Sequence, residues 1–334
     1  MPLVIPIFIR HRGCPHLCLF CNQYAIAGSG DDCPNGTEIG AHIRSWLDRS
    51  PGRAEVQVAF YGGSFTCLPG HEQDELLGGV EPFLARGEVQ SIRLSTRPDC
   101  ISTASCTRLK SFGVELIELG VQSFDDGVLR TARRGHDRND SLAAIHQLRQ
   151  AGIAVGIQLL PGLPGETTSS FFAGIRTALD LKPDLVRLYP TLVLADSGLA
   201  ELYQKGKYRP LSLNRAIALC RRAREMFVAA GIPVVRMGLQ PSPSLARQLI
   251  AGPYHPAFGE LVVARSWFRQ IRAHLALLAD GQRLTVHLSH RDISAAVGMQ
   301  KKNTERLAKL GFAGRYQLVA EQQRRRGSAA YVVS

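Results

Sequence analysis

The sequence has no apolar run long enough to cross a lipid bilayer, for which about 20 consecutive apolar residues are needed. Its first ten residues, MPLVIPIFIR, are too short and too alternating for a signal peptide with a cleavage site. It also has no short-period repeat and no low-complexity tract, so a repeat architecture is not expected. We therefore expect a cytoplasmic globular protein without a membrane partner.

The cysteines do not form the pattern of a disulfide framework. Three of the eight are clustered near the start of the chain, and the other five are scattered at Cys33, Cys67, Cys100, Cys106 and Cys220. A reducing cytosol would leave the scattered cysteines as thiols. Each of them is expected to be a small buried apolar residue rather than a ligand.

Acidic residues are in deficit. The chain has 28 Asp and Glu against 40 Lys and Arg, and its formal net charge is +12. Basic residues cluster at 133–134, 205–209, 221–224, 301–302 and 324–326. Such a field favours a polyanionic partner, nucleic acid above all. A solvated basic surface without a partner is the alternative.

Apolar, β-rich runs alternate with amphipathic stretches along most of the chain, which predicts an α/β fold with a parallel sheet. Strands are expected at 3–9, 55–61, 91–96, 114–122, 153–160, 185–191 and 232–238. Helices are expected near 37–49, 71–86, 102–112, 139–151, 167–180 and 212–230. Thr167 and Ser212 stand where N-caps of two of these helices are expected.

This alternation suits a partial or full TIM-like (β/α) barrel over residues 1–240. The sequence PSPS after Gln240 marks a break, and residues 241–334 are predicted to form a small C-terminal α+β extension of unknown role. In a β/α barrel, functional residues gather at the carboxyl ends of the strands. The segments that follow the first five strands are unusual: a cysteine cluster, YGGSFT, STRPD, GVQSF and LPGLPGE. We expect the functional site there.

The cysteine cluster, in RGCPHLCLFCNQ, has the spacing C-x3-C-x2-C, formed by Cys14, Cys18 and Cys21. A zinc site would need a fourth ligand, for which His11 or His16 is available. An iron–sulfur cubane would use three thiolates and leave one iron open for a substrate or cofactor. The spacing favours the cluster. Cys33 is not expected to be a fourth ligand, because it lies beyond a Gly, Ser and Asp stretch.

With the aromatic Phe20 before its last cysteine, this motif after the first strand resembles that of the radical S-adenosylmethionine (radical SAM) superfamily. The resemblance covers roughly residues 3–240. It implies that Cys14, Cys18 and Cys21 ligate a 4Fe–4S cluster whose open iron is chelated by SAM. It also implies cleavage of SAM to a 5′-deoxyadenosyl radical and a low-potential electron donor such as flavodoxin or ferredoxin.

Other strand ends extend the resemblance to SAM-contacting positions. Gly62, Gly63 and Ser64 stand where the family has its GGE motif, whose backbone meets the methionine amino group. The positions that align with SAM contacts of the oxygen-independent coproporphyrinogen oxidase group are Ser95, Gln122, Arg134 and Gln158. That group more often has acidic residues at the positions of Ser95 and Gln158. Arg134 is expected to pair with the SAM carboxylate.

Several longer stretches resemble the radical SAM domain of the Elongator catalytic subunit and its prokaryotic relatives, which act on the wobble uridine of tRNA. They are HRGCPHLCLFCNQ, FYGGSFTCLP, STRPD, ELGVQSF, RRGH, GLPGE and RLYPTLVL. The sequence has no Gly-rich acetyl-CoA loop and no room for an acetyltransferase domain. The substrate therefore does not carry over with the fold. The resemblance and the basic charge together favour an enzyme that acts on RNA of the tRNA type.

Other functions stay open at this point. One is a radical SAM enzyme that acts on a small molecule or a tetrapyrrole, as the coproporphyrinogen oxidase group does. Another is a non-catalytic haem carrier with His255 or His290 as an axial ligand. The last is a zinc-stabilised RNA-binding module without catalysis.

Overall fold

The computed structural model describes residues 2–9, 13–22 and 34–334. The chain forms two compact units, residues 1–212 with 226–256 and residues 213–225 with 257–334, so the boundary falls within helix α10 (Leu213–Ala229). The expected division at residue 240 stays a prediction. No helix among the described residues is long and apolar enough to cross a membrane.

The first unit is built on a seven-stranded sheet in which every neighbouring pair is parallel. The strand order is β1-β2-β3-β4-β5-β6-β8, and β1 and β8 are its two edges. The strands are β1 (Leu3–Phe8), β2 (Val56–Tyr61), β3 (Ser91–Thr96), β4 (Val114–Gln122), β5 (Ala154–Leu159), β6 (Leu185–Leu188) and β8 (Val234–Met237). This open half-barrel confirms the predicted fold in its partial form.

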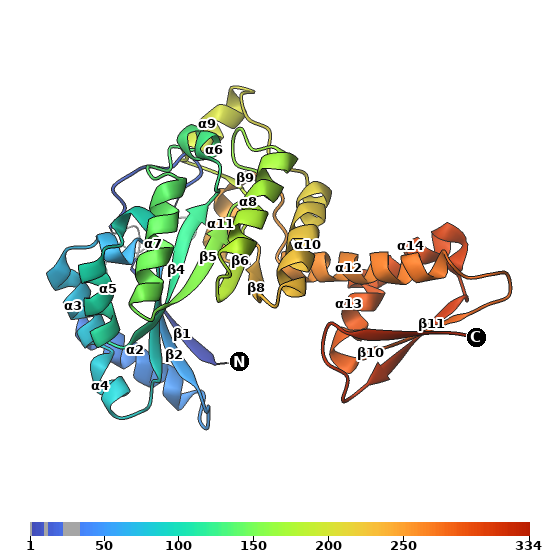
Figure 1. Cartoon of the computed structure of the whole chain (residues 1–334), viewed down its shortest axis with the longest axis horizontal. Helices are drawn as coiled ribbons and strands as arrows, with labels where there is room; N and C mark the ends of the chain where they lie inside the picture. Colours follow the sequence, from blue (N-terminus) through green and yellow to red (C-terminus); the bar gives the residue numbers. More distant parts are fainter. Residues whose placement is uncertain (1, 10–12, 23–33) are drawn as a thin grey trace. The chain divides into compact units, whose positions relative to one another are not determined.

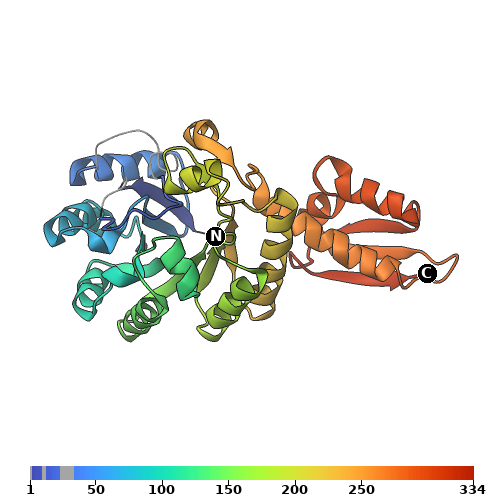
Figure 2. The same cartoon turned by 90° about the horizontal axis from the view of Figure 1, so that it is seen from above.

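Helices cover one face of this sheet, and the view from above shows the sheet curving away from them (Figures 1 and 2). They include α2 (Gly36–Asp48), α3 (Gly70–Gly78), α4 (Glu81–Ala85), α5 (Thr103–Ser111), α7 (Arg138–Gln150) and α8 (Thr168–Asp180). Two short helices, α6 (Asp126–Thr131) and α9 (Gly198–Gln204), lie instead at the carboxyl ends of the strands (Figure 1). Thr167 is the N-cap of α8, as predicted, and its side chain accepts from the Ser170 N–H in a capping box.

The helix predicted over 71–86 is instead two helices, α3 and α4. Two glycines, Gly78 and Gly79, lie at the join and weaken a continuous helix. Gly79 also packs on α2 so closely that a Cβ there would stand 2.8 Å from the carbonyl oxygen of Gly36. The sequence prediction missed the short helix α6, which ends just before the turn that carries Arg134.

The central strands are buried on both faces, as expected of a parallel sheet covered by helices. In β2, the side chains of Val58, Ala59 and Phe60 are fully buried, and Ile117 and Leu119 are fully buried in β4. A second, antiparallel pair, β7 (Val193–Leu194) and β9 (Leu249–Ala251), follows β6, with α11 (Pro243–Gln248) just before β9. Leu192, Leu194 and Leu245 form a small core there.

The second unit contains a mixed three-stranded sheet, which confirms the predicted small α+β extension. Its order is β11-β10-β12, with β10 (Leu284–Ser289) parallel to β11 (Tyr316–Glu321) and antiparallel to β12 (Ala329–Val333). Helices α12 (Phe258–Leu275), α13 (Ile293–Val297) and α14 (Lys302–Leu307) complete it. Trp267, Phe268 and Ile271 of α12 pack with Leu284, Val286 and Leu288 of β10 in its core.

Candidate functional site

A cavity of about 810 Å³ opens at the carboxyl ends of the parallel strands of the first unit. Its wall combines backbone of the glycine turn after β2 with side chains from β3, β4, β5, β6 and β8 and from the loop after β1. This is the edge at which the sequence predicted the site. The reason is that strands running in the same direction end on the same side of the sheet.

Every residue that the sequence singled out for the cluster or for SAM lines this cavity. They are Cys14, Cys18, Phe20, Cys21, Gly62, Gly63, Ser64, Ser95, Gln122, Arg134 and Gln158. The structure therefore brings these positions together from five strand ends. Their individual roles stay predictions.

The cysteine loop is anchored on both sides by backbone hydrogen bonds. The N–H of Leu19 donates to the carbonyl oxygen of Ala132 at 3.0 Å, and the carbonyl of Leu19 accepts from Leu199 at 2.7 Å. Phe20, half-buried, packs against an apolar cluster that includes Val128 of α6 and another that includes Leu199 of α9. These contacts direct the loop towards the cavity, where Cys18 is buried and Cys14 and Cys21 are partly exposed.

Among residues 2–9, 13–22 and 34–334, no group of three or more His, Cys, Asp or Glu side chains lies close enough together to hold a metal ion. The three thiols thus line one cavity without forming a preassembled ligand set. Three cysteines in a loop beside a glycine turn are still the donor type of an iron–sulfur site. Which groups ligate iron stays a prediction.

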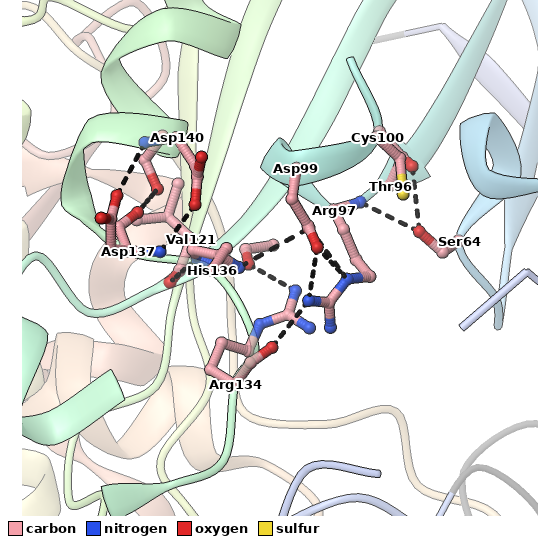
Figure 3. Close-up of polar contacts among 12 residues, drawn as sticks. Ser64, Thr96, Arg97, Asp99, Cys100, Val121, Arg134, His136, Asp137 and Asp140 are labelled. Atoms are coloured by element: carbon pink, nitrogen blue, oxygen red, sulfur yellow. Dashed lines mark hydrogen bonds and ion pairs between the residues drawn. The ribbon is translucent and has the colours of Figure 1, made fainter. Parts of the chain in front are cut away.

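Two buried arginines approach the sulfur of Cys18. Nη1 of Arg134 lies 3.6 Å and Nη1 of Arg97 lies 3.9 Å from Cys18 Sγ. Nη2 of Arg97 also donates to the carbonyl oxygen of Arg134 at 2.7 Å, and Nη2 of Arg134 donates to that of Gly120 at 2.7 Å (Figure 3). Two positively charged side chains beside one sulfur would stabilise a negative charge at this position, such as that of a thiolate-ligated cluster or of a bound carboxylate.

The charge of Arg97 is balanced by a single carboxylate, that of Asp99. Nε and Nη2 of Arg97 donate to its two oxygens at 2.9 and 2.8 Å (Figure 3). Burial alone would raise the pKa of Asp99, but the hydrogen bonds and charge of Arg97 hold it below its usual range. Burial, with the nearby charge of Arg134, lowers the pKa of His136 to about 3, so this imidazole is neutral at pH 7. Arg134 is left without an acidic partner among the described residues.

Gln122 is held in a strained backbone conformation at the end of β4. Its φ is 68°, in the left-handed region, at an irregularity in the pairing of β4 with β5. Its Oε1 and the Nε of Arg134 are both buried without a hydrogen-bond partner among the described residues. One orphaned acceptor and one orphaned donor in the same cavity fit a ligand with an ammonium and a carboxylate group, as in the methionine part of SAM.

The glycine turn after β2 packs directly on the cysteine loop. A Cβ on Gly13 would stand 2.2 Å from the carbonyl oxygen of Ser64, and Gly13 itself has a φ of 76°. Gly62 also adopts a positive φ, 83°, which favours glycine. The hydroxyl group of Ser64 already makes contacts within the protein. Its Oγ accepts a hydrogen bond from the backbone N–H of Arg97 and lies 3.1 Å from Oγ1 of Thr96 (Figure 3).

Cys67 and Cys100 form a disulfide, so the expectation that both are thiols is wrong for this structure. The two lie 33 positions apart, in the segments after β2 and β3. Because β2 and β3 are neighbours in the sheet, their following segments run side by side and bring the two Cα atoms to 5.3 Å. Cys106 and Cys220 are buried, as predicted, and belong to no disulfide, whereas Cys33 lies outside the described residues.

A buried charge network that reaches the wall of the cavity was not predicted from the sequence. The fully buried carboxylate of Glu118 on β4 forms ion pairs with Arg93 of β3 and Arg187 of β6. The hydroxyl of Tyr61 donates to its Oε1 at 3.3 Å. Burial, together with Glu118, raises the pKa of Tyr61 to about 12, which keeps this donor protonated. The signal was the presence of charged residues inside three otherwise apolar strands.

The same carboxylate positions Gln158, one of the predicted SAM contacts. Nε2 of Gln158 donates to Oε2 of Glu118 at 3.1 Å and to Oγ of Ser95 at 3.3 Å. Oε1 of Gln158 accepts no hydrogen bond from the part of the chain that the structure describes, and the hydroxyl of Ser95 can still donate its proton, so both side chains can bond a polar ligand in the cavity. The neutral side chains of Ser95 and Gln158 are thus linked, through Gln158, to the buried carboxylate of Glu118.

The histidines named for the alternative sites lie in different places. His255 and His290, the predicted axial ligands of a haem carrier, do not line the cavity. His16 lines it, with its ring packed against Gly135, but belongs to no metal-ligand group among the described residues. His11 lies outside those residues.

Two family models match the chain, the radical SAM superfamily over residues 8–173 and the radical SAM C-terminal domain over residues 183–268. An uncharacterized protein of Methanocaldococcus jannaschii is 30% identical over 225 residues, which cover 64% of this chain and 69% of that protein. The chain belongs to the radical SAM superfamily. It is accordingly a radical SAM enzyme whose reaction is to be determined, and membership implies a 4Fe–4S cluster and SAM as cofactors.

Among similar proteins with a named activity, the tRNA uridine(34) acetyltransferase of Dehalococcoides mccartyi is 35% identical over 239 residues. That match covers 62% of this radical SAM chain but only 52% of the acetyltransferase. The solved structure of the archaeal Elp3 of Methanocaldococcus infernus has a TM-score of 0.60 at 23% identity, covering 83% of this chain and 64% of that one. At that identity the likeness shows the shared fold.

Proposed function

We propose that this radical SAM enzyme holds a 4Fe–4S cluster through Cys14, Cys18 and Cys21, cleaves SAM reductively and modifies RNA of the tRNA type. The observation that carries the proposal is the single cavity in which the cysteine loop meets the predicted SAM positions from five strand ends. When bound there, the cluster and SAM would supply a 5′-deoxyadenosyl radical for hydrogen abstraction.

The protein's part in this chemistry is to bind SAM and to orient it. The guanidinium of Arg134, whose Nε is buried without a partner among the described residues, would hold the SAM carboxylate. Oε1 of Gln122 would accept from the SAM ammonium, together with backbone of Gly62 and Gly63. Ser95 and Gln158, already linked to each other, would bond hydroxyl groups of the ribose.

An anionic substrate is supported by the charge of the cavity wall. The described residues that line it include four arginines, Arg97, Arg134, Arg187 and Arg236, and no Asp or Glu. Arg97 and Arg187 have carboxylate partners, whereas Arg134 and Arg236 have none among the described residues. A nucleotide brings its own phosphates, and a target base would leave its stack to enter the cavity, which favours a nucleotide in a loop.

The relation to tRNA uridine(34) acetyltransferases, though it covers about half of such a protein, supports RNA over other anions. The proposed setting is the cytoplasm, with a low-potential donor such as flavodoxin or ferredoxin reducing the cluster. A small anionic molecule or a tetrapyrrole is the rival substrate, and its carboxylates could use the same arginines.

Cluster ligation is tested by anaerobic reconstitution with iron and sulfide. Alanine at Cys14, Cys18 or Cys21 should each abolish the brown chromophore in the UV-visible spectrum and lower the iron content. The matched control is Cys106→Ala, a buried cysteine of α5 that does not line the cavity and should keep both. Cys33→Ala should also keep them. Loss of the chromophore from Cys33→Ala would mean a closed four-cysteine site and contradict the proposal.

The reaction and substrate class are tested with reduced, reconstituted protein and SAM. Formation of 5′-deoxyadenosine and methionine is expected, at a rate that rises when bulk tRNA from a deletion strain is added. Formation of 5′-deoxyadenosine that tRNA neither binds to nor accelerates would favour a small-molecule substrate. An intact, reducible cluster that never yields 5′-deoxyadenosine would instead support a carrier.

A further inference from the structure

The positive charge of the chain is concentrated in the second unit. Residues 213–225 and 257–334 carry 17 Lys and Arg against six Asp and Glu, a net charge of +11 out of the +12 of the whole chain. The first unit is almost neutral, with 23 basic and 22 acidic residues. This unit is therefore the part of the chain to which a polyanion would be drawn most strongly.

Within the second unit, four arginines from three helices lie within electrostatic reach of one another. Arg265 and Arg269 stand one turn apart on α12, Arg221 lies on α10 and Arg306 on α14. We call them the arginine cluster. Burial lowers the pKa of Arg265, and Arg306, Arg221 and Arg269 lower it further by repulsion. Folding thus brings these like charges together at a cost.

Contacts with neutral groups hold the cluster in place. Nη2 of Arg265 donates to Oδ1 of Asn214 at 3.0 Å, and the guanidinium of Arg306 stacks 4.8 Å from the ring centre of Phe268. Buried Asn303 fastens α14 to α12 through a hydrogen bond from its Nδ2 to the carbonyl oxygen of Ala264 at 2.8 Å. These contacts orient the cations without neutralising them.

Carboxylates are scarce around the cluster. Arg221 pairs with Glu225, but Arg265, Arg269 and Arg306 have no acidic partner among the described residues. By contrast, Arg324 pairs with Glu321 and Arg326 with the buried Asp292, so two of the three arginines at 324–326 already have a carboxylate partner within the unit. A phosphate would relieve the repulsion in the cluster and gain charge-assisted hydrogen bonds from arginine.

We propose that the second unit is an RNA-binding module whose arginine cluster contacts the phosphate backbone. This inference rests on the proposed RNA substrate and names the part of the chain that binds it. Three helices present the cations at fixed positions, as a structured RNA with regularly spaced phosphates requires. Because phosphate contacts carry little sequence information, the cluster supplies affinity and register rather than choice of base.

The test is filter binding of bulk tRNA to the full-length protein across a salt series. The variant Arg265→Gln, Arg269→Gln and Arg306→Gln should lose at least about tenfold in affinity. Its plot of log affinity against log salt should be shallower by about 2 to 3, because each lost phosphate contact removes about 0.7–0.9 from the slope. Thermal melting of each protein checks that the variant is folded.

The matched control removes the same charge from the first unit, as Arg53→Gln, Arg130→Gln and Arg176→Gln. These side chains are exposed and have no ion pair among the described residues. The control should bind tRNA within about twofold of wild type. A folded cluster variant that binds like wild type, or a control that loses as much, would overturn the inference.

Two further outcomes separate this inference from the proposed function. Wild-type protein that forms 5′-deoxyadenosine but binds no tRNA at low salt would overturn the RNA substrate and this inference with it. Tight tRNA binding that is unchanged in the cluster variant would overturn this inference alone. Vesicles containing phosphatidylserine serve as the competing anionic surface, and binding to them in preference to tRNA would also contradict an RNA-binding module.

Discussion

Arg134 and Cys18 meet in the cavity although 116 positions separate them in the sequence. Nη1 of Arg134 lies 3.6 Å from Sγ of Cys18, and the guanidinium is buried. Burial lowers the pKa of Arg134, so its positive charge is costly here, and negative charge on the sulfur side offsets part of that cost. The pair links the loop expected to hold the cluster with the residue expected to hold SAM.

Replacing Arg134 by alanine should weaken SAM binding to the reconstituted protein by about 1.5–3 kcal/mol, the range of a charge-assisted hydrogen bond. Arg134→Lys should recover only part of this loss, because lysine lacks the planar fork. The neighbouring Arg133 is exposed, so Arg133→Ala is the control. Equilibrium dialysis with SAM measures the difference, and equal affinity in the two alanine variants would rule out the carboxylate contact.

Glu118 of β4 stabilises the sheet of the half-barrel through ion pairs with β3 and β6. Glu118→Ala would leave Arg93 and Arg187 without their shared carboxylate, and we expect the free energy of unfolding to fall by about 3–5 kcal/mol. Glu118→Gln should cost less, because it keeps an acceptor. Urea denaturation measures both. Glu115→Ala, at an exposed position of the same strand, should change stability by less than about 1 kcal/mol, and a similar loss from Glu115 would contradict the assignment.

Glu166 makes stability depend on pH. Burial, assisted by the charge of Asp125, raises the pKa of Glu166 to about 8 from an ordinary value near 4.5, although its carboxyl group accepts from the Gly162 N–H. The folded state therefore keeps a proton that the unfolded state releases. This contribution to stability is full below pH 4.5 and is lost as the pH rises to about 8, by at most about 1.4 kcal/mol per pH unit.

Glu166→Gln should remove this dependence, because an amide does not titrate. Unfolding free energies of wild type and variant, measured in urea at several pH values across that range, should be similar near pH 4.5, where both side chains are neutral in the folded state, and should diverge as the pH rises and wild type loses stability. Glu201→Gln, at an exposed position, should follow wild type throughout. A constant difference between wild type and Glu166→Gln over the whole range would show that the carboxyl group titrates normally.

The Cys67–Cys100 disulfide ties together the segments that carry the glycine turn and Arg97. Non-reducing peptide mapping should recover the two cysteines in one linked pair. Reduction should lower the free energy of unfolding by about 3–4 kcal/mol in the chain-entropy model for a loop of this length. The Cys67→Ser, Cys100→Ser variant should melt at the same temperature with and without reductant. Complete alkylation of both thiols in unreduced, native protein would contradict the bond.

Much of the fold and of the site could be predicted from the sequence. Parallel strands were recognisable because they are buried on both faces and read as short apolar runs, and their order placed the cysteine loop, the glycine turn, Gln122 and Gln158 at one edge. The exact helix boundaries were less accessible. The join between α3 and α4 depends on how closely Gly79 packs against α2, which is a tertiary contact.

Other parts of the site could not be predicted, because they depend on which side chains meet across strands. Glu118, Arg93 and Arg187 are separated by long stretches of sequence, and only the register of β3, β4 and β6 brings their charges together. The disulfide follows in the same way from the adjacency of β2 and β3. Sequence spacing alone does not encode such proximity.

The amino-acid sequence by itself determined the net charge of +12, the cysteine motif and the order of strands and helices. Only the tertiary structure decided where that charge resides. Residues 213–225 are separated from residues 257–334 in sequence, yet hydrogen bonds from Arg265 to Asn214 and from Ser266 to Glu225 join α12 to α10, and the two segments form one unit with a charge of +11. The net charge is the sum of the charges of the residues and can be read from the sequence. The location of that charge depends on which segments, distant in sequence, the folded chain brings together.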